Sequence, residues 1–156
     1  MPSSIEELKE NLKKYEGVMV ATEYYLLESE MNRGISTISL AISPQLKANI
    51  EAYIFAAGAL YFAGVEITMS NLQNIFVAAG LIPDKILVEG VTNLKFRNRL
   101  SYILAIAFLD SLGKKVTIEE ILNVVEGFDI DPDYSKAKET IEAYNKFAPQ
   151  FGLNTV

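Results

Sequence analysis

The sequence matches itself when residues 53–94 are placed on residues 102–143, an offset of 49 positions without a gap. A left-handed glycine commonly closes a helix, and a threonine commonly caps the start of one. The identical pairs that would fix such turns are Gly64 and Gly113, Thr68 and Thr117, Pro83 and Pro132, and Asp84 and Asp133. Chance similarity between apolar helices is the alternative. The spacing favours two similar three-helix units.

The remainder of the chain precedes this repeat. Residues 3–15 are predicted to form an amphipathic helix that Gly17 ends. Residues 18–31 are compatible with a helix or a strand, while residues 35–43 alternate apolar and hydroxyl side chains. This alternation is typical of a half-buried strand, so a β-hairpin is favoured for residues 18–43.

We therefore expect a mainly α fold. The predicted parts are an N-terminal helix with the β-hairpin (1–50), a first helical unit (51–98) and a second helical unit (99–148), together forming one compact domain. A length of 156 residues and a hydrophobic fraction of 50% are enough for one domain with a buried hydrophobic core.

Composition excludes several kinds of chemistry. The chain has no cysteine and no histidine, which excludes thiolate chemistry, Cys/His zinc sites and serine–histidine triads within one chain. We expect no cofactor. The net charge of −6 argues against a DNA-binding surface, including a helix-turn-helix interpretation of residues 68–94.

The sequence offers no span for a membrane. The most apolar run, residues 53–64, is shorter than the ~20 residues that a spanning helix needs. The polar N-terminal segment does not resemble a signal peptide. A soluble, cytoplasmic protein is the expectation.

The repeated unit resembles a known family. The segment YIFAAGALYFAGVEITMSNLQNIFVAAGL is similar to the N-terminal helical domain of archaeal and eukaryotic acidic ribosomal stalk proteins, and residues 102–144 follow the same order. Proteins of that family dimerise through these helices and recruit translation factors with a mobile acidic tail. The final residues, APQFGLNTV, lack such a tail. The resemblance implies a helical dimerisation unit that is present twice in tandem.

An acidic stretch invites a metal-site interpretation. Asp129, Asp131 and Asp133 alternate like the first ligands of a calcium-binding loop. Tyr134 stands where that loop needs glycine, and Thr140 stands where it needs a bidentate glutamate. We therefore interpret the stretch as a helix junction first, with Asp133 or Ser135 as the cap, and as a weak metal candidate second.

Two further groups of charged residues are candidates. Lys95, Arg97 and Arg99 interleave an aromatic residue and could contact RNA phosphates, although a solvated connector between the units is the commoner meaning of such a run. The acidic residues Glu23, Glu28 and Glu30 could serve a carboxylate-based hydrolase. That hydrolase would require acidic residues gathered in one deep pocket, whereas a solvated face is the simpler interpretation.

Aromatic side chains on the most apolar helices suggest binding to another protein or to a second copy of the chain. These residues are Tyr53, Phe55, Tyr61, Phe62, Tyr102 and Phe108. Helices that are apolar on nearly all sides often leave one face for a partner. The sequence thus favours a non-enzymatic interaction or scaffold module, and the family resemblance suggests a role near translation. An RNA-contacting subunit and a carboxylate-based hydrolase are the alternatives.

Overall fold

The computed structural model describes residues 5–33, 56–60, 63–66, 68–78, 94–127 and 130–156. Its elements in chain order are α1 (Ile5–Arg33), α3 (Met69–Ala78), α5 (Leu94–Ser111), α6 (Ile118–Glu126), α7 (Tyr134–Phe147) and the short 3-10 helix η1 (Ala148–Phe151). Residues 56–60 are also helical, and no strand occurs among the residues described. The mainly α fold is confirmed.

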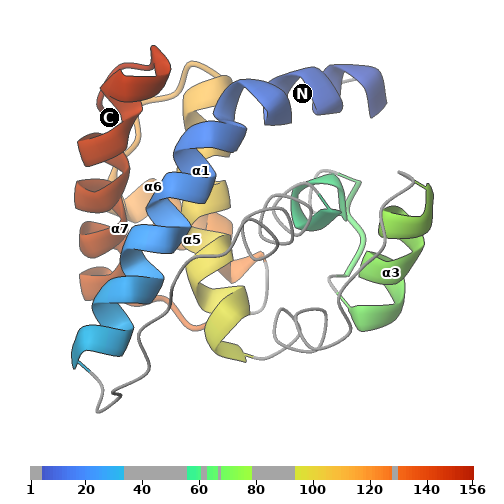
Figure 1. The fold of residues 1–156 in the computed structure, drawn as a ribbon, viewed down its shortest axis with the longest axis horizontal. Helices are drawn as coiled ribbons and strands as arrows, with labels where there is room; N and C mark the ends of the chain where they lie inside the picture. Colours follow the sequence, from blue (N-terminus) through green and yellow to red (C-terminus); the bar gives the residue numbers. More distant parts are fainter. Residues whose placement is uncertain (1–4, 34–55, 61–62, 67, 79–93, 128–129) are drawn as a thin grey trace.

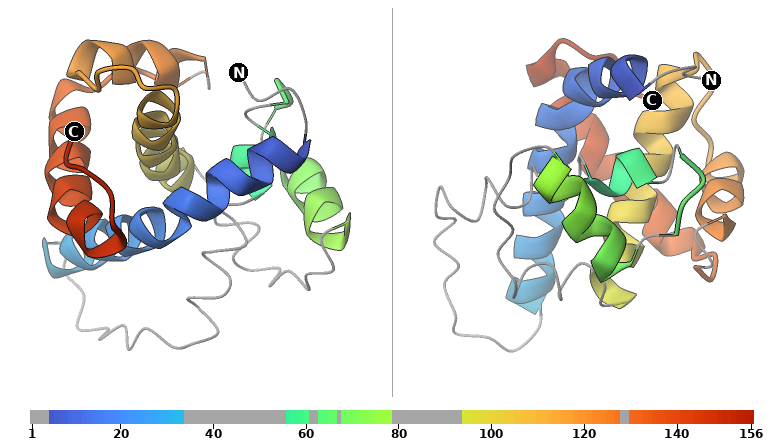
Figure 2. Two further views of the ribbon diagram at one scale, coloured as in Figure 1. Left: turned by 90° about the horizontal axis from the view of Figure 1, so that it is seen from above. Right: turned by 90° about the vertical axis from the view of Figure 1, so that its right-hand side faces the viewer.

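Four helices form the main body of the structure. Helix α1 packs against α5, α7 and η1, and α6 packs against both α5 and α7. In Figure 1, α1, α5 and α7 lie side by side, while α3 and residues 56–60 lie to one side of them. The left view of Figure 2 shows the same separation from above. Helix α5 is at the centre, since nearly every residue from Arg99 to Leu109 is buried.

Helix α1 corrects two expectations. It runs through Gly17 without a break, and residues 18–31 are helical rather than a strand of a hairpin. The reason is visible in which positions are buried. Seven described side chains of α1 are buried. Six of them follow the helical period of three and four residues, namely Tyr15, Val18, Met19, Thr22, Glu23 and Leu26, and Val20 is the seventh. Thr22 and Glu23 are polar, which hides the pattern in the sequence. The other predicted strand, residues 35–43, lies outside the described residues.

Gly17 has a packing role instead of a terminating one. The aromatic ring of Phe151, from η1, lies against α1 at this position, and a Cβ added at Gly17 would overlap that ring. Glycine is unfavourable inside a helix by about 1 kcal/mol relative to alanine. Here its missing side chain lets the end of η1 approach the α1 backbone.

The residues after η1 fold back and hold it in place. Gly152 adopts a left-handed conformation (φ 73°), and the Leu153 N–H donates to the Ala148 carbonyl over 3.0 Å. The Leu153 side chain is buried. The Asn145 side chain of α7 then pairs with the backbone of Val156, donating over 3.0 Å and accepting over 2.7 Å.

The turns of the repeat have the same hydrogen bonds at the same offset. Gly64 and Gly113 adopt φ of 71° and 70°. The bonds Ala63 N–H to Ala59 O and Val65 N–H to Leu60 O correspond to Leu112 N–H to Phe108 O and Lys114 N–H to Leu109 O. The Thr68 hydroxyl accepts from the Asn71 N–H over 3.1 Å, and the Thr117 hydroxyl accepts from the Glu120 N–H over 3.2 Å.

These matched bonds confirm the helix-closing glycines and the threonine caps. Helices α3 and α6 also begin at equivalent positions, Met69 and Ile118. The third helix predicted for the first unit lies in residues 79–93, outside the described part of the chain. The boundaries proposed for the two units stay predictions.

The close approach at Gly17 can be tested by a double-mutant cycle. Gly17→Ala should stabilise α1 by about 1 kcal/mol when Phe151 is replaced by alanine, because only the helix propensity then changes. In the wild-type background the new methyl group must displace the Phe151 ring, so the gain should be smaller by at least about 0.5 kcal/mol. Urea unfolding of the four proteins measures this coupling. An equal effect of Gly17→Ala in both backgrounds would contradict the contact.

Candidate functional site

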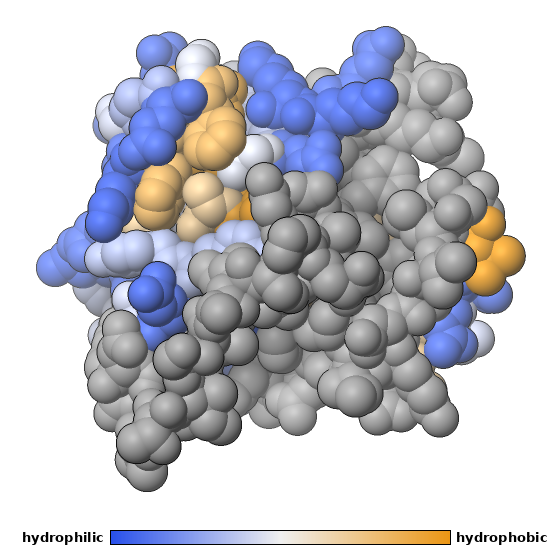
Figure 3. Space-filling model, in the orientation of Figure 1, coloured by the Kyte–Doolittle hydropathy of each residue, from blue (hydrophilic) through white to orange (hydrophobic). Residues whose placement is uncertain are grey.

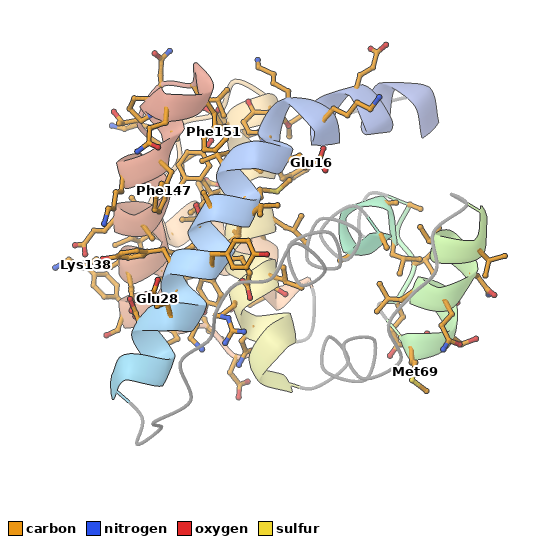
Figure 4. All side chains as sticks on the ribbon, viewed as in Figure 1. Glu16, Glu28, Met69, Lys138, Phe147 and Phe151 are labelled. Carbon is orange, nitrogen blue, oxygen red and sulfur yellow. The ribbon has the colours of Figure 1, made fainter. Side chains whose placement is uncertain are left out.

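An exposed aromatic surface runs along the seam between α1 and α7. We define this aromatic surface by Tyr25 of α1, Lys146 and Phe147 of α7, and Phe151 of η1. Tyr25 is 37% exposed and Phe151 is 45% exposed, and Phe147 is half-buried. Figure 4 shows Phe147 and Phe151 between α7 and α1. The apolar atoms in the same part of Figure 3 are bordered by hydrophilic atoms.

The antiparallel packing of α1 and α7 places these residues together. On α1, positions 17, 21, 25 and 29 follow one another at intervals of one helical turn and so lie on one face. Phe151 lies against Gly17, while the Tyr25 ring meets the Phe147 ring edge-to-face with centroids 5.8 Å apart. Such aromatic pairs contribute about 0.5–1.5 kcal/mol beyond their buried area. The seam is therefore stabilised while part of each ring stays exposed.

A pocket of about 350 Å³ continues this surface along the seam. We call it the α1–α7 pocket, and its lining residues are Tyr25, Ser29, Glu139, Glu142, Ala143 and Lys146. The Lys146 ammonium lies 4.2 Å from the centre of the Tyr25 ring and 5.7 Å from that of Phe147. The pocket thus combines one aromatic ring, two carboxylates and one ammonium group.

A buried ion pair joins α1 to α5 in the core of the structure. The Arg99 Nε donates to Glu23 Oε1 over 3.0 Å, and the two side chains are 4% and 1% exposed. The neighbouring Thr22 hydroxyl donates to the Val18 carbonyl of its own helix over 2.6 Å. Burying two charges is costly unless they pair, so each charge here requires the other.

A second polar contact, a partly buried hydrogen bond, joins α1 to α5. The Tyr15 hydroxyl of α1 donates to Asp110 Oδ2 of α5 over 2.8 Å. Burial raises the pKa of Tyr15 well above its ordinary value, and the Asp110 hydrogen bond and charge raise it further. Burial also raises the pKa of Tyr144 in α7, with the Asp110 charge as the second cause. Both phenols are therefore held in the protonated form.

The start of α7 explains the acidic stretch. The Asp133 carboxylate accepts from the Lys136 N–H over 3.0 Å and so caps α7, as one of the two expected caps. The Asp133 N–H donates to the Tyr102 hydroxyl over 2.8 Å. Asp131 is exposed, while Asp129 lies outside the described residues. Within the described ranges, no three acidic side chains gather as metal ligands would.

The structure corrects two expectations, one for the basic residue Arg99 and one for the aromatic residue Tyr102. Arg99 is buried in its ion pair, so its guanidinium is not available for RNA, and residues 94–99 belong to α5 rather than to a solvated connector. Tyr102 is fully buried and cannot contact a partner. Phe108 is half-buried. The side chains of Lys95 and Arg97 lie outside the described part, as do Tyr53, Phe55, Tyr61 and Phe62.

The acidic candidates on α1 are also separated by the structure. Glu23 is buried rather than on a solvated face, whereas Glu28 is exposed. Only the backbone of Glu30 is described. Because α1 is a helix, Glu23 and Glu28 point in different directions and form no common site.

The residues of the aromatic surface were not singled out by the sequence. The signal that could have found them is the i, i+4 row from Gly17 to Ser29, which is recognisable only once α1 is known to be continuous. Phe147 and Phe151 share the same spacing at the end of α7 and η1. Their pairing with α1 depends on tertiary packing.

Comparison with known proteins gives no relative from which to infer a role: no family model, curated protein or solved structure matches this chain. The resemblance to ribosomal stalk proteins therefore stays a prediction. Among the helices in the described ranges, none has the combination of length and apolar character that crossing a membrane demands.

The buried ion pair yields a prediction about stability. Arg99→Met should lower the free energy of unfolding by about 3–5 kcal/mol, because the Glu23 carboxylate stays buried while the Arg99 charge 3.0 Å from it is removed. Replacing both residues with methionine should cost clearly less than Arg99→Met alone. Glu28→Gln, at an exposed position of the same helix, is the control and should change stability by less than about 0.5 kcal/mol. Urea unfolding measures all three effects. A double variant less stable than Arg99→Met would contradict this account.

The buried tyrosines yield a prediction about pH. Their folded pKa values lie above the ordinary value of about 10. The stability that they contribute is thus fully present below about pH 10 and is lost as the pH rises above it, since the unfolded chain then releases protons that the folded chain retains. Urea unfolding between about pH 8 and pH 11 should show this fall. Tyr144→Phe should make it shallower, and an unchanged slope would contradict burial of this phenol.

Proposed function

We propose that this chain is a non-enzymatic helical interaction module that binds another protein through the aromatic surface. The observation that supports this is the partial exposure of Tyr25, Phe147 and Phe151 along the α1–α7 seam. Tyrosine and phenylalanine are enriched at the centres of protein interfaces. The resemblance to stalk proteins makes a translation complex the first setting in which to look for the partner.

The energetic argument concerns the exposed parts of the rings. An aromatic side chain buries roughly 150–250 Å² when fully covered. Covering the remaining exposed fractions of Tyr25 (37%) and Phe151 (45%) would then gain roughly 2 kcal/mol for each ring at ~25 cal/mol per Å². Both rings already contact neighbouring residues on one side, so little side-chain freedom remains to be lost on binding.

The two alternatives receive less support. The RNA interpretation loses Arg99, which is committed to Glu23 in the core. The hydrolase interpretation predicted acids in one deep pocket, and the α1–α7 pocket does contain Glu139 and Glu142. However, Glu142 is exposed to water, whereas a general acid at neutral pH usually needs desolvated surroundings.

The proposal is tested by affinity capture with matched variants. Tyr25→Ala removes an aromatic ring from the surface, and Tyr134→Ala removes one from the opposite end of α7, where Tyr134 is 64% exposed. Proteins captured from native lysate by the wild-type chain should be recovered about tenfold less with Tyr25→Ala and equally with Tyr134→Ala, as measured by quantitative mass spectrometry. Equal recovery with all three baits would contradict the proposed surface.

A further inference from the structure

The α1–α7 pocket already holds one cation, and that cation comes from the chain itself. Lys146 places its ammonium 4.2 Å from the centre of the Tyr25 ring and 5.7 Å from that of Phe147. The two rings are fixed against each other, with planes inclined by 67°. Together they form a corner whose electron-rich faces attract positive charge.

The attachment of Lys146 is weak compared with that of the rings. Lys146 is exposed on the surface of α7, and a surface cation–π contact is worth only about 0.5–1 kcal/mol. Its long side chain regains rotamer freedom when it leaves the ring. Lys146 can therefore be displaced at small cost, whereas Tyr25 and Phe147 remain in position.

The pocket without Lys146 would present an aromatic corner beside carboxylates. Glu142 is exposed and Glu139 is half-buried, and both line the pocket on α7. An arginine side chain suits such surroundings better than lysine, because its planar guanidinium stacks on a ring and binds a carboxylate with two donors. An anion is disfavoured, since it would lie beside the exposed Glu142 carboxylate.

We propose that the α1–α7 pocket binds an arginine side chain of the partner protein, and that Lys146 occupies this place until the partner binds. This inference rests on the proposed function, because the pocket adjoins the aromatic surface. The neighbouring rings of Phe147 and Phe151 then receive the apolar residues that flank the arginine. The partner segment is thus basic and apolar, and its charge complements this acidic chain, whose net charge is −6.

The charge of the partner residue can be tested with three short peptides. Each carries one central residue flanked by leucines, and this residue is arginine, its uncharged isostere citrulline, or glutamate. Titration of the isotope-labelled protein, followed by nuclear magnetic resonance, gives the dissociation constants. The arginine peptide should bind more tightly than the other two. Equal binding of arginine and citrulline, or tighter binding of glutamate, would overturn the proposal.

Variants of the pocket separate displacement of Lys146 from other roles. Lys146→Ala removes the competing cation and should tighten binding of the arginine peptide by about two- to fivefold, the factor to which a surface cation–π contact corresponds. Glu142→Gln should weaken that binding by a similar factor. Both positions are exposed, so the folded state should persist, which thermal unfolding checks. If Lys146→Ala bound the arginine peptide more weakly, the proposed displacement of Lys146 would be refuted, because Lys146 would then contribute to the complex.

The two proposals fail in different ways. If capture depends on Tyr25 while the three peptides bind alike, the interaction surface stands and the arginine site is refuted. If the arginine peptide binds preferentially while capture is independent of Tyr25, the pocket recognises arginine and the proposed interaction surface is refuted.

Discussion

The arrangement of the helices depends on the buried ion pair between Glu23 and Arg99. Because neither charge can be buried alone, the side of α1 that carries Glu23 must face α5. Once one side of a helix is oriented, the directions of all its other side chains follow. Tyr25 lies two residues further, about 200° around the helix axis, and so faces away from α5 towards α7. The same contact that closes the core therefore sets the direction of the side chains at the surface.

The surface along the seam between α1 and α7 depends on contacts between residues that are far apart in the sequence. Gly17 is needed because the Phe151 ring lies against it, and this ring is held by the left-handed turn at Gly152 and by the burial of Leu153. The α1–α7 pocket lies further along the same seam. Its lining, one ammonium over the Tyr25 ring beside two carboxylates, comes from two helices that are far apart in sequence.

The sequence predicted those features whose causes lie within a few residues. The caps at Thr68, Thr117 and Asp133 were identifiable because a hydroxyl or carboxylate reaches an N–H three residues away. Gly17 and Glu23 were misinterpreted because their partners are distant in the chain. Tyr102 was misassigned to a partner surface because an apolar helix with aromatic residues has the same composition whether it lies at the centre of a fold or at its edge. The aromatic surface was missed because its residues on α1 and on α7 and η1 are also distant from one another in the chain.

The repeated turn has a consequence for which side chains of α3 and α6 are free to differ. The hydrogen bonds that close the two turns involve mainly backbone atoms, one glycine and one threonine, so they place few demands on the outward-facing side chains of α3 and α6. Equivalent exposed positions carry different residues: Val77 on α3 corresponds to Glu126 on α6. The same turn geometry can therefore support a different surface chemistry at each of its two places in the chain.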